Sequence, residues 1–301
     1  MLWLFIIISA YFLFAITALV DKYLLIGPPN PKIYSFYVGT LGILVLLLIP
    51  FVGFSIPSFW QIILSLLAGI LFLLALFTLY TALEHFEVSR VVPAIGGILP
   101  LFTFGLVLLL GDKEGMGFFK ILAFLLLILG SVLISFKKEK SITLKSFSIS
   151  VLAAFLFSLS FVLAKFVYLS QPFWSGFIWI RIGSLLAAIF FIFTPEVKKE
   201  IFQKQFSFRK KTGTLFVLNQ IVGAGGSILQ NFAIALVSLG FLPFINALEG
   251  TRYVFLLIFA SLISFKFPRI LKEEISRKIL FQKILAVLLI AGGLLLLAYG
   301  V

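Results

Sequence analysis

The sequence predicts an all-α integral membrane protein in which ten transmembrane helices form two inverted five-helix repeats. The first reason is composition, because 62% of the 301 residues are hydrophobic and only 12% are charged. A water-soluble fold of this length could not hide so much apolar surface. The second reason is that apolar stretches of about 20 residues, long enough to cross a hydrocarbon core of about 30 Å as helices, recur along the chain. The third is that the two halves of the chain resemble each other.

The expected helices follow one another with short connections and short tails. The first apolar stretch has no basic region before it and no small-residue cleavage site after it, so we expect a helix rather than a removed signal peptide. The chain contains no cysteine, which excludes disulfides and thiolate metal sites. The expected spans are roughly 2–21, 33–51, 59–83, 88–110, 118–136, 146–168, 173–194, 213–237, 239–265 and 279–300.

The net charge of +13 is concentrated in a few connections. Most of the 24 Lys and Arg residues lie at 135–145, 196–211 and 266–283, each after an odd-numbered helix. Short loops rich in Lys and Arg stay in the cytoplasm, so we expect these connections inside the cell and both termini outside. The basic excess therefore indicates topology and contact with anionic membrane lipids, and it does not indicate nucleic-acid binding.

Two pairs of segments carry the resemblance between the halves. The segment "AYFLFAITALVDKYLLIGPP" (10–29) aligns with "AAFLFSLSFVLAKFVYLSQP" (153–172). The segment "KILAFLLLILGSVL" (120–133) aligns with "KILAVLLIAGGLLL" (283–296). Both alignments match residues that apolar composition alone does not explain, namely Lys22 with Lys165 and Gly130 with Gly293.

Five expected helices precede a basic linker at about 137–145, and five follow it. We therefore expect one membrane domain made of a first repeat at 1–139 and a second repeat at 140–301. Because each repeat has an odd number of helices, the second is inverted relative to the first. Inverted repeats are frequent in secondary transporters, whose substrate site lies near the middle of the membrane between the halves.

These segments resemble the EamA-like ten-helix members of the drug/metabolite transporter (DMT) superfamily. The resemblance covers nearly the whole chain and rests on "AAFLFSLSFVLAKF" with Arg181 in the next helix, and on "PLFTFGLVLLLGDKEG" (100–115), where Gly111-Asp112 matches that family's Gly-acid pair. It implies metabolite transport in the direction of efflux. The expected location is the cell membrane, of the prokaryotic inner-membrane type. Many members of the family are drawn with cytoplasmic termini, opposite to the orientation that the charges predict.

Two full charges lie inside the expected ninth helix, in "NALEGTRYVFLLIFASLISF" (246–265). With a rise of 1.5 Å per residue, Glu249 and Arg252 are expected about 15–20 Å deep, near the middle of the membrane. At i and i+3 they can pair on one helix face, flanked by Asn246 and Tyr253. Charges at this depth usually pair, face a cavity and mark a pathway. Two roles for the pair remain possible, a structural ion pair and a substrate site. In a substrate site, Arg252 would hold a carboxylate or phosphate, and Glu249 would bind an amine or carry a coupling proton.

Polar side chains also follow the expected eighth helix, 213–237. The residues that recur at helical spacing and share one face are Gln220, Gly223, Ser227 and either Gln230 or Asn231. Facing lipid, this stripe would be costly, so we expect it to meet another helix or a cavity. Interhelical hydrogen bonding and a lining of the substrate site are both open as its role.

Other candidates are scattered over the chain. With the same rise of 1.5 Å per residue, Arg181 lies about 12 Å along the seventh helix. It could pack against other helices or belong to the substrate site, and both roles are open. In the first half, Tyr11 and Tyr80 are candidates for the substrate site. Lys165 is expected to reach the membrane interface with its long side chain. The segment "PAIGGILP" (93–100) is expected to interrupt the fourth helix, because Pro and Gly bend helices or open their backbone.

The leading hypothesis is a secondary transporter that moves a small polar or zwitterionic metabolite by alternating access, with no cofactor, metal or catalytic residue. One alternative is a membrane enzyme acting on lipid head groups, which would need clustered acids or histidines at the interface. The sequence has a single His and no Asp-rich motif. The other alternative is a non-transporting assembly partner, in which Glu249 and Arg252 contact only each other.

Overall fold

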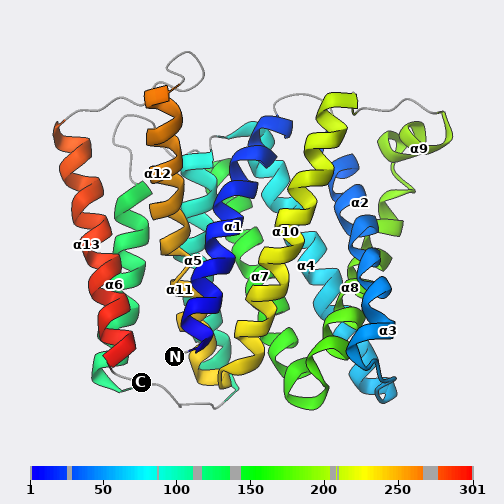
Figure 1. The fold of residues 1–301 in the computed structure, drawn as a ribbon, viewed down its shortest axis with the longest axis horizontal. Coiled ribbons are helices and arrows are strands. Elements are labelled where there is room, and N and C mark those ends of the chain that lie inside the picture. Colours follow the sequence, from blue (N-terminus) through cyan, green and yellow to red (C-terminus); the bar gives the residue numbers. More distant parts are fainter. Residues whose placement is uncertain are drawn as a thin grey trace.

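A computed structural model describes residues 2–25, 29–86, 88–110, 117–135, 144–203, 208, 210–266 and 277–299. These residues form a bundle of helices (Figure 1). The helices of the first half are α1 (Leu2–Leu25), α2 (Pro31–Leu41), the 3-10 helix η1 (Gly42–Leu48), α3 (Ile49–Val52), α4 (Phe59–His85), α5 (Val88–Leu109) and α6 (Phe118–Ser135). Those of the second half are α7 (Leu144–Ser170), α8 (Phe173–Phe191), α9 (Pro195–Phe202), α10 (Lys210–Leu236), the 3-10 helix η2 (Leu239–Phe241), α11 (Leu242–Ala247), α12 (Gly250–Lys266) and α13 (Arg277–Tyr299).

The bundle consists of apolar helices that expose large apolar side chains on their outer surface. Within the described residues, six segments are long and apolar enough to cross a membrane, and they lie in α1, the run Pro31–Val52, α4, α7, α8 and α10. Phe51 and Leu109 are among the most exposed residues. Water disfavours a continuous surface of this kind, whereas lipid chains do not. The predicted class, a multi-pass α-helical membrane protein, is therefore confirmed.

The two termini lie at one end of the bundle (Figure 1). The short helix α9 and the Lys266 end of α12 lie at the opposite end. Helix α9 carries Lys198 and Lys199 of one basic connection, and Lys266 begins another. These two connections therefore start on the same face of the protein. Connections that all lie on one side of the membrane must share a face in this way.

The three most extensive helix pairs between the two halves are α1 with α10, α4 with α7, and α6 with α13. In the last pair, one glycine of each helix lies against the other helix. A Cβ atom on Gly130 would lie 2.6 Å from Cγ1 of Ile290. A Cβ atom on Gly293 would lie 2.8 Å from Cγ of Leu127. The contact is reciprocal, because Gly130 aligns with Gly293 and Leu127 aligns with Ile290, and the helices approach closely because neither glycine has a side chain.

Two lysines at aligned positions bind the C-terminal ends of helices. On α1, Lys22 Nζ donates to the carbonyl oxygens of Leu83 at 2.5 Å and Phe86 at 3.0 Å, where α4 ends. On α7, Lys165 Nζ donates to the carbonyl oxygen of Ala235 at 3.1 Å, in the last turn of α10. Carbonyls there lack intrahelical partners and favour a positive charge. Lys165 is buried between the helices, and its ammonium group lies at the end of α10.

Two predicted spans are divided in the structure. The span 33–51 consists of α2, η1 and α3. The predicted ninth helix, 239–265, is interrupted, because α11 ends at Ala247 and α12 begins at Gly250. Helix α5 continues through 93–100, and its bounds match the predicted span 88–110. Proline is tolerated in a membrane helix whose neighbours satisfy the freed backbone, and α5 packs against α6, α7 and α11. The Gly111-Asp112 pair and residues 137–143 of the basic linker lie outside the described residues.

Replacing Gly293 with Ala is expected to destabilise the protein. The added Cβ would press on Leu127, and overpacking of this kind costs about 1–3 kcal/mol. Gly292→Ala is the matched control, because its Cβ would meet only Leu126 Cδ1 at 3.9 Å. Thermal unfolding in detergent micelles should give a melting temperature several degrees lower for G293A than for G292A. Equal values would contradict a close contact between α6 and α13.

Candidate functional site

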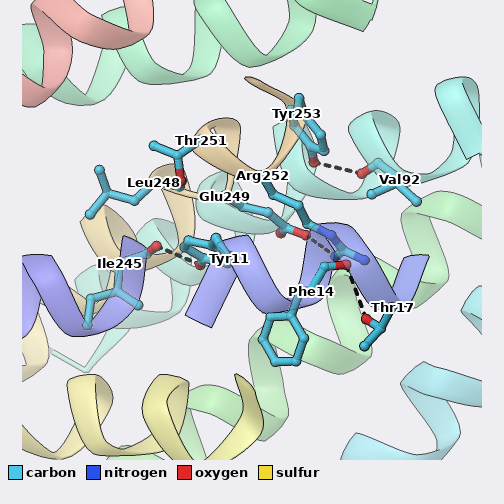
Figure 2. Close-up of polar contacts among 10 residues, drawn as sticks. All are labelled: Tyr11, Phe14, Thr17, Val92, Ile245, Leu248, Glu249, Thr251, Arg252 and Tyr253. Atoms are coloured by element: carbon cyan, nitrogen blue, oxygen red, sulfur yellow. Dashed lines mark hydrogen bonds and ion pairs between the residues drawn. The ribbon is translucent and has the colours of Figure 1, made fainter. Parts of the chain in front are cut away.

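The site lies at the break between α11 and α12. Here the Glu249 N–H donates to Asn246 O at 3.1 Å, and the Arg252 N–H donates to Glu249 O at 2.9 Å. Bonds between residues three apart tighten the backbone, as they do at helix ends. The break places Glu249 and Arg252 side by side, and their side chains form an ion pair with 3.0 Å between Oε1 and Nη1 (Figure 2).

Two tyrosines hold the segment around the break against neighbouring helices (Figure 2). The hydroxyl of Tyr11 on α1 donates to Ile245 O at 2.8 Å. The hydroxyl of Tyr253 on α12 donates to Val92 O on α5, also at 2.8 Å. Gly96 permits the second approach, because a Cβ at this position would collide with the Tyr253 hydroxyl. Protein groups thus provide the hydrogen bonds that an apolar environment cannot supply.

A cavity of about 440 Å³ lies beside the ion pair. Its walls come from both halves of the chain, and most of the lining is apolar. The polar side chains that line it are Tyr11, Thr17, Asp21, Tyr80, Arg181, Asn219, Gln220, Ser227, Gln230, Glu249 and Arg252. We call four of them the charged wall, namely Asp21, Arg181, Glu249 and Arg252.

Arg181 reaches the cavity from α8. Its Nη2 donates to the hydroxyl of Ser227 on α10. Its guanidinium carbon lies 5.1 Å from the ring centroid of Phe72 and 4.9 Å from that of Phe177. Aromatic faces stabilise a cation where water is scarce. Arg181 is therefore held between aromatic rings at the cavity wall.

The charged wall offers binding groups of both signs. The guanidinium of Arg252 lies 5.8 Å from the ring of Phe14, and its buried Nε has no hydrogen-bond partner among the described residues. A guanidinium presents several N–H donors in a planar fork that matches carboxylates and phosphates. The carboxylates of Asp21 and Glu249 are acceptors suited to an ammonium group. Within the described residues, no group of three or more His, Cys, Asp or Glu side chains could hold a metal ion. The wall thus suits a zwitterionic ligand.

Most residues predicted for the substrate site line this cavity. They are Tyr11, Tyr80, Arg181, Gln220, Ser227, Gln230, Glu249 and Arg252. The other three residues do not line the cavity. Asn246 donates to Thr103 Oγ1 at 2.8 Å, and Tyr253 is bonded to α5 as described. Asn231 accepts a hydrogen bond from the Tyr168 hydroxyl at 2.8 Å. These three side chains tie helices together instead of facing the cavity.

The cavity also contains a polar cluster that the sequence analysis missed. Oδ1 of Asp21 accepts hydrogen bonds from the Tyr34 hydroxyl at 2.5 Å and from Asn219 Nδ2 at 2.7 Å. Helices α1, α2 and α10 therefore meet at one carboxylate. In the sequence, Asp21 stands beside Lys22 after an apolar run and resembles a charge at a helix end. The signal that could have identified it is its i+4 spacing from Thr17, which places both on one helix face.

Aromatic side chains join α10 to α2 and to α8. Where α2 begins, Tyr34 packs against Phe216 of α10, with ring centroids 5.0 Å apart. Where α8 begins, Phe173 packs against Phe232 of α10, with centroids 5.1 Å apart. These contacts hold α10 against the beginnings of both helices.

Comparison with known proteins identifies the fold alone. No protein-family model and no curated protein matches the chain. A solved structure described only as "Crystal structure of protein" is similar over 97% of this chain and 94% of that chain, with a TM-score of 0.70 and 16% sequence identity. The helical arrangement of nearly the whole chain therefore occurs in another protein, and a shared fold does not by itself assign a function.

Replacing Tyr34 with Phe is expected to lower the free energy of unfolding by about 1–3 kcal/mol, because the buried Asp21 carboxylate loses a donor while the ring stays. Tyr23→Phe is the control, because Tyr23 is 61% exposed and the loss of its hydroxyl should cost less. Chemical unfolding in mixed micelles measures both. If Y34F is as stable as Y23F, the hydroxyl does not stabilise the carboxylate.

Proposed function

We propose that the protein is a secondary transporter that moves a small polar or zwitterionic metabolite across the membrane by alternating access. The observation that carries this proposal is the cavity of about 440 Å³, in which the charged wall lies at a helix break inside an apolar bundle. Charged groups inside a membrane bundle are costly and usually mark a substrate or ion pathway. Broken helices beside a central cavity are frequent in transporters. The volume suits a small solute.

The proposed architecture is ten transmembrane helices in two inverted repeats, 1–139 and 140–301. The first repeat would use α1, α2 with η1 and α3, α4, α5 and α6, and the second α7, α8, α10, α11 with α12, and α13. Under this relation α1 corresponds to α7, α4 to α10 and α6 to α13. The α1–α10 pair therefore corresponds to the α7–α4 pair, and the α6–α13 pair corresponds to itself. All three pairs occur. The reciprocal glycines and the two capping lysines support the same relation. Elements related by a two-fold axis make such reciprocal contacts.

One pair of helices departs from this symmetry. Helix α4 packs tightly along α8, where a Cβ on Gly69 or Gly183 would collide with the backbone of the other helix. The corresponding pair under exchange is α10 with α2, and in the described residues it makes no comparable contact. In the proposed cycle, the arrangement with α4 packed on α8 is one of two states. In the other state, α2 closes on α10 and α4 separates from α8, which exchanges access between the two faces.

Direction, location and coupling are part of the proposal. The resemblance to EamA-like transporters supports export, and the Lys- and Arg-rich connections support a cytoplasmic position for the face that carries α9. Glu249 is the proposed carrier of a coupling proton, because its carboxylate lines the cavity and pairs with Arg252.

Single-cysteine labelling tests the proposed orientation. The chain has no cysteine, so Lys198→Cys on α9 and Ile56→Cys near the other end each introduce one thiol at an exposed position. A membrane-impermeant maleimide added to intact cells should label I56C and leave K198C unlabelled until the cells are permeabilised. The reverse pattern would establish the opposite orientation, with the basic face outside.

Transport by charge variants tests the function. Proteoliposomes are first screened with labelled amino acids, nucleosides, sugars, organic cations and zwitterionic lysophospholipids, and at least one of these solutes should be taken up. For an anionic or zwitterionic substrate, Arg252→Lys should reduce uptake at least about ten-fold, because lysine lacks the planar fork of donors. The double variant Glu249→Leu with Arg252→Leu should abolish uptake.

The matched control for this double variant removes a charge pair elsewhere. Lys32 and Glu196 form a partly exposed ion pair with 2.8 Å between Nζ and Oε1. Exposed pairs contribute about 0–1 kcal/mol, so K32L with E196L should transport normally. If the Glu249 and Arg252 double variant transports like the parent at equal expression, the buried pair is structural. If no solute is taken up by the parent, the assembly-partner alternative is favoured.

A further inference from the structure

The cavity reaches the surface of the protein at the side of the bundle. The exposed residues among those that line it all lie on η1 and α10, namely Leu44 at 56%, Val217 at 47%, Ile221 at 63%, and Ala224. We call these four residues the lateral mouth. Val217, Ile221 and Ala224 recur at helical spacing and form one edge of the mouth, while Leu44 forms the other.

The lateral mouth lies at the depth of the hydrocarbon core. Leu44 and Ile221 stand near the middle of the apolar runs Pro31–Val52 and Thr212–Leu236. A position near the middle of a membrane-spanning run is far from both aqueous faces. Among the described residues, the mouth opens where η1 makes no extensive contact with α10, whereas η1 packs on α8 and α10 packs on α1. The mouth therefore faces lipid chains.

The lining of the cavity combines charged and apolar surface. The charged wall holds two arginines and two acids, whereas the four residues of the lateral mouth are apolar. A polar group placed between Leu44 and Ile221 would lie against hydrocarbon chains, which is unfavourable. A wholly apolar molecule would add no partner to the charged wall. One ligand matches both regions only if it has a charged part and a hydrocarbon part.

From this combination of surfaces we propose that the substrate is a single-chain amphiphile with a zwitterionic head. Arg181 or Arg252 binds the anionic group of the head, and Asp21 or Glu249 binds its ammonium group. The hydrocarbon chain passes between Leu44 and Ile221 into the bilayer. This inference rests on the proposed transport function and narrows its substrate class.

Two probes with the same head test the inference. Glycerophosphoethanolamine has the zwitterionic head without a chain, and its monomyristoyl ester, a lysophosphatidylethanolamine, adds one chain. The concentration that gives half-maximal thermal stabilisation is measured for the full-length protein in phospholipid nanodiscs. The chain-bearing probe is expected to act at a concentration at least about ten-fold lower, because burial of its methylene groups favours binding.

Tryptophan substitutions separate binding at the mouth from general effects of the lipid. L44W and I221W place a bulky ring in the mouth and should raise the half-maximal concentration of the lysophospholipid at least about ten-fold, while that of glycerophosphoethanolamine changes less than about two-fold. L47W and L218W are the matched controls. Leu47 and Leu218 lie on the same two helices and are 69% and 56% exposed, but they do not line the cavity. Both controls should leave both concentrations unchanged.

Three results would overturn the inference. They are equal action of the two probes on the parent, a loss in L44W no larger than in L47W, and no stabilisation by either probe. The transport screen reports on the proposed function separately. If chainless solutes are carried and L44W carries them normally, the protein is a transporter but its substrate is not an amphiphile. If the lysophospholipid binds through the mouth and proteoliposomes move neither it nor any screened solute, the site stands and transport is wrong.

Discussion

The structure depends on how charged and polar groups are accommodated inside an apolar bundle. Glu249 and Arg252 lie where a helix is broken, and each neutralises the other at 3.0 Å. The break exposes backbone groups that lipid and apolar side chains cannot satisfy. Tyr11 supplies a hydrogen bond to the segment before the break, and Tyr253 ties the segment after it to α5.

Helix association supplies the second constraint. Lipid chains are as apolar as leucine, so helices in a membrane associate through close packing and hydrogen bonds rather than through burial alone. The glycines between α6 and α13 and between α4 and α8 provide such close packing. Helix α2 and η1 lack an equivalent contact with α10, and the cavity extends to the surface between them. The proposed change of access rests on this difference between tight pairs on one side and an open pair on the other.

The position of a charged residue in the sequence does not reveal its role in the structure. Lys22 and Lys165 occupy aligned positions, and each bonds the C-terminal end of a helix. They support the scaffold, whereas Arg181 and Asp21 face the cavity. A charged residue in a membrane helix is therefore no guide to a binding site until its partner is known. The charged wall and the apolar mouth give one cavity two kinds of surface, which is the basis for the substrate class proposed above.

The sequence by itself determined the all-α, multi-pass class, because hydrocarbon thickness dictates the length of an apolar run. It also singled out Glu249 and Arg252, since their i and i+3 spacing is local and their cost in a membrane is high. Only the tertiary structure decided that Asp21 joins the cavity, because its partner Asn219 is 198 residues away. It likewise decided that Lys165 caps α10 and that the ninth span breaks before Gly250. The partner of a buried polar group comes from whichever helix packs beside it, and no local pattern specifies that neighbour.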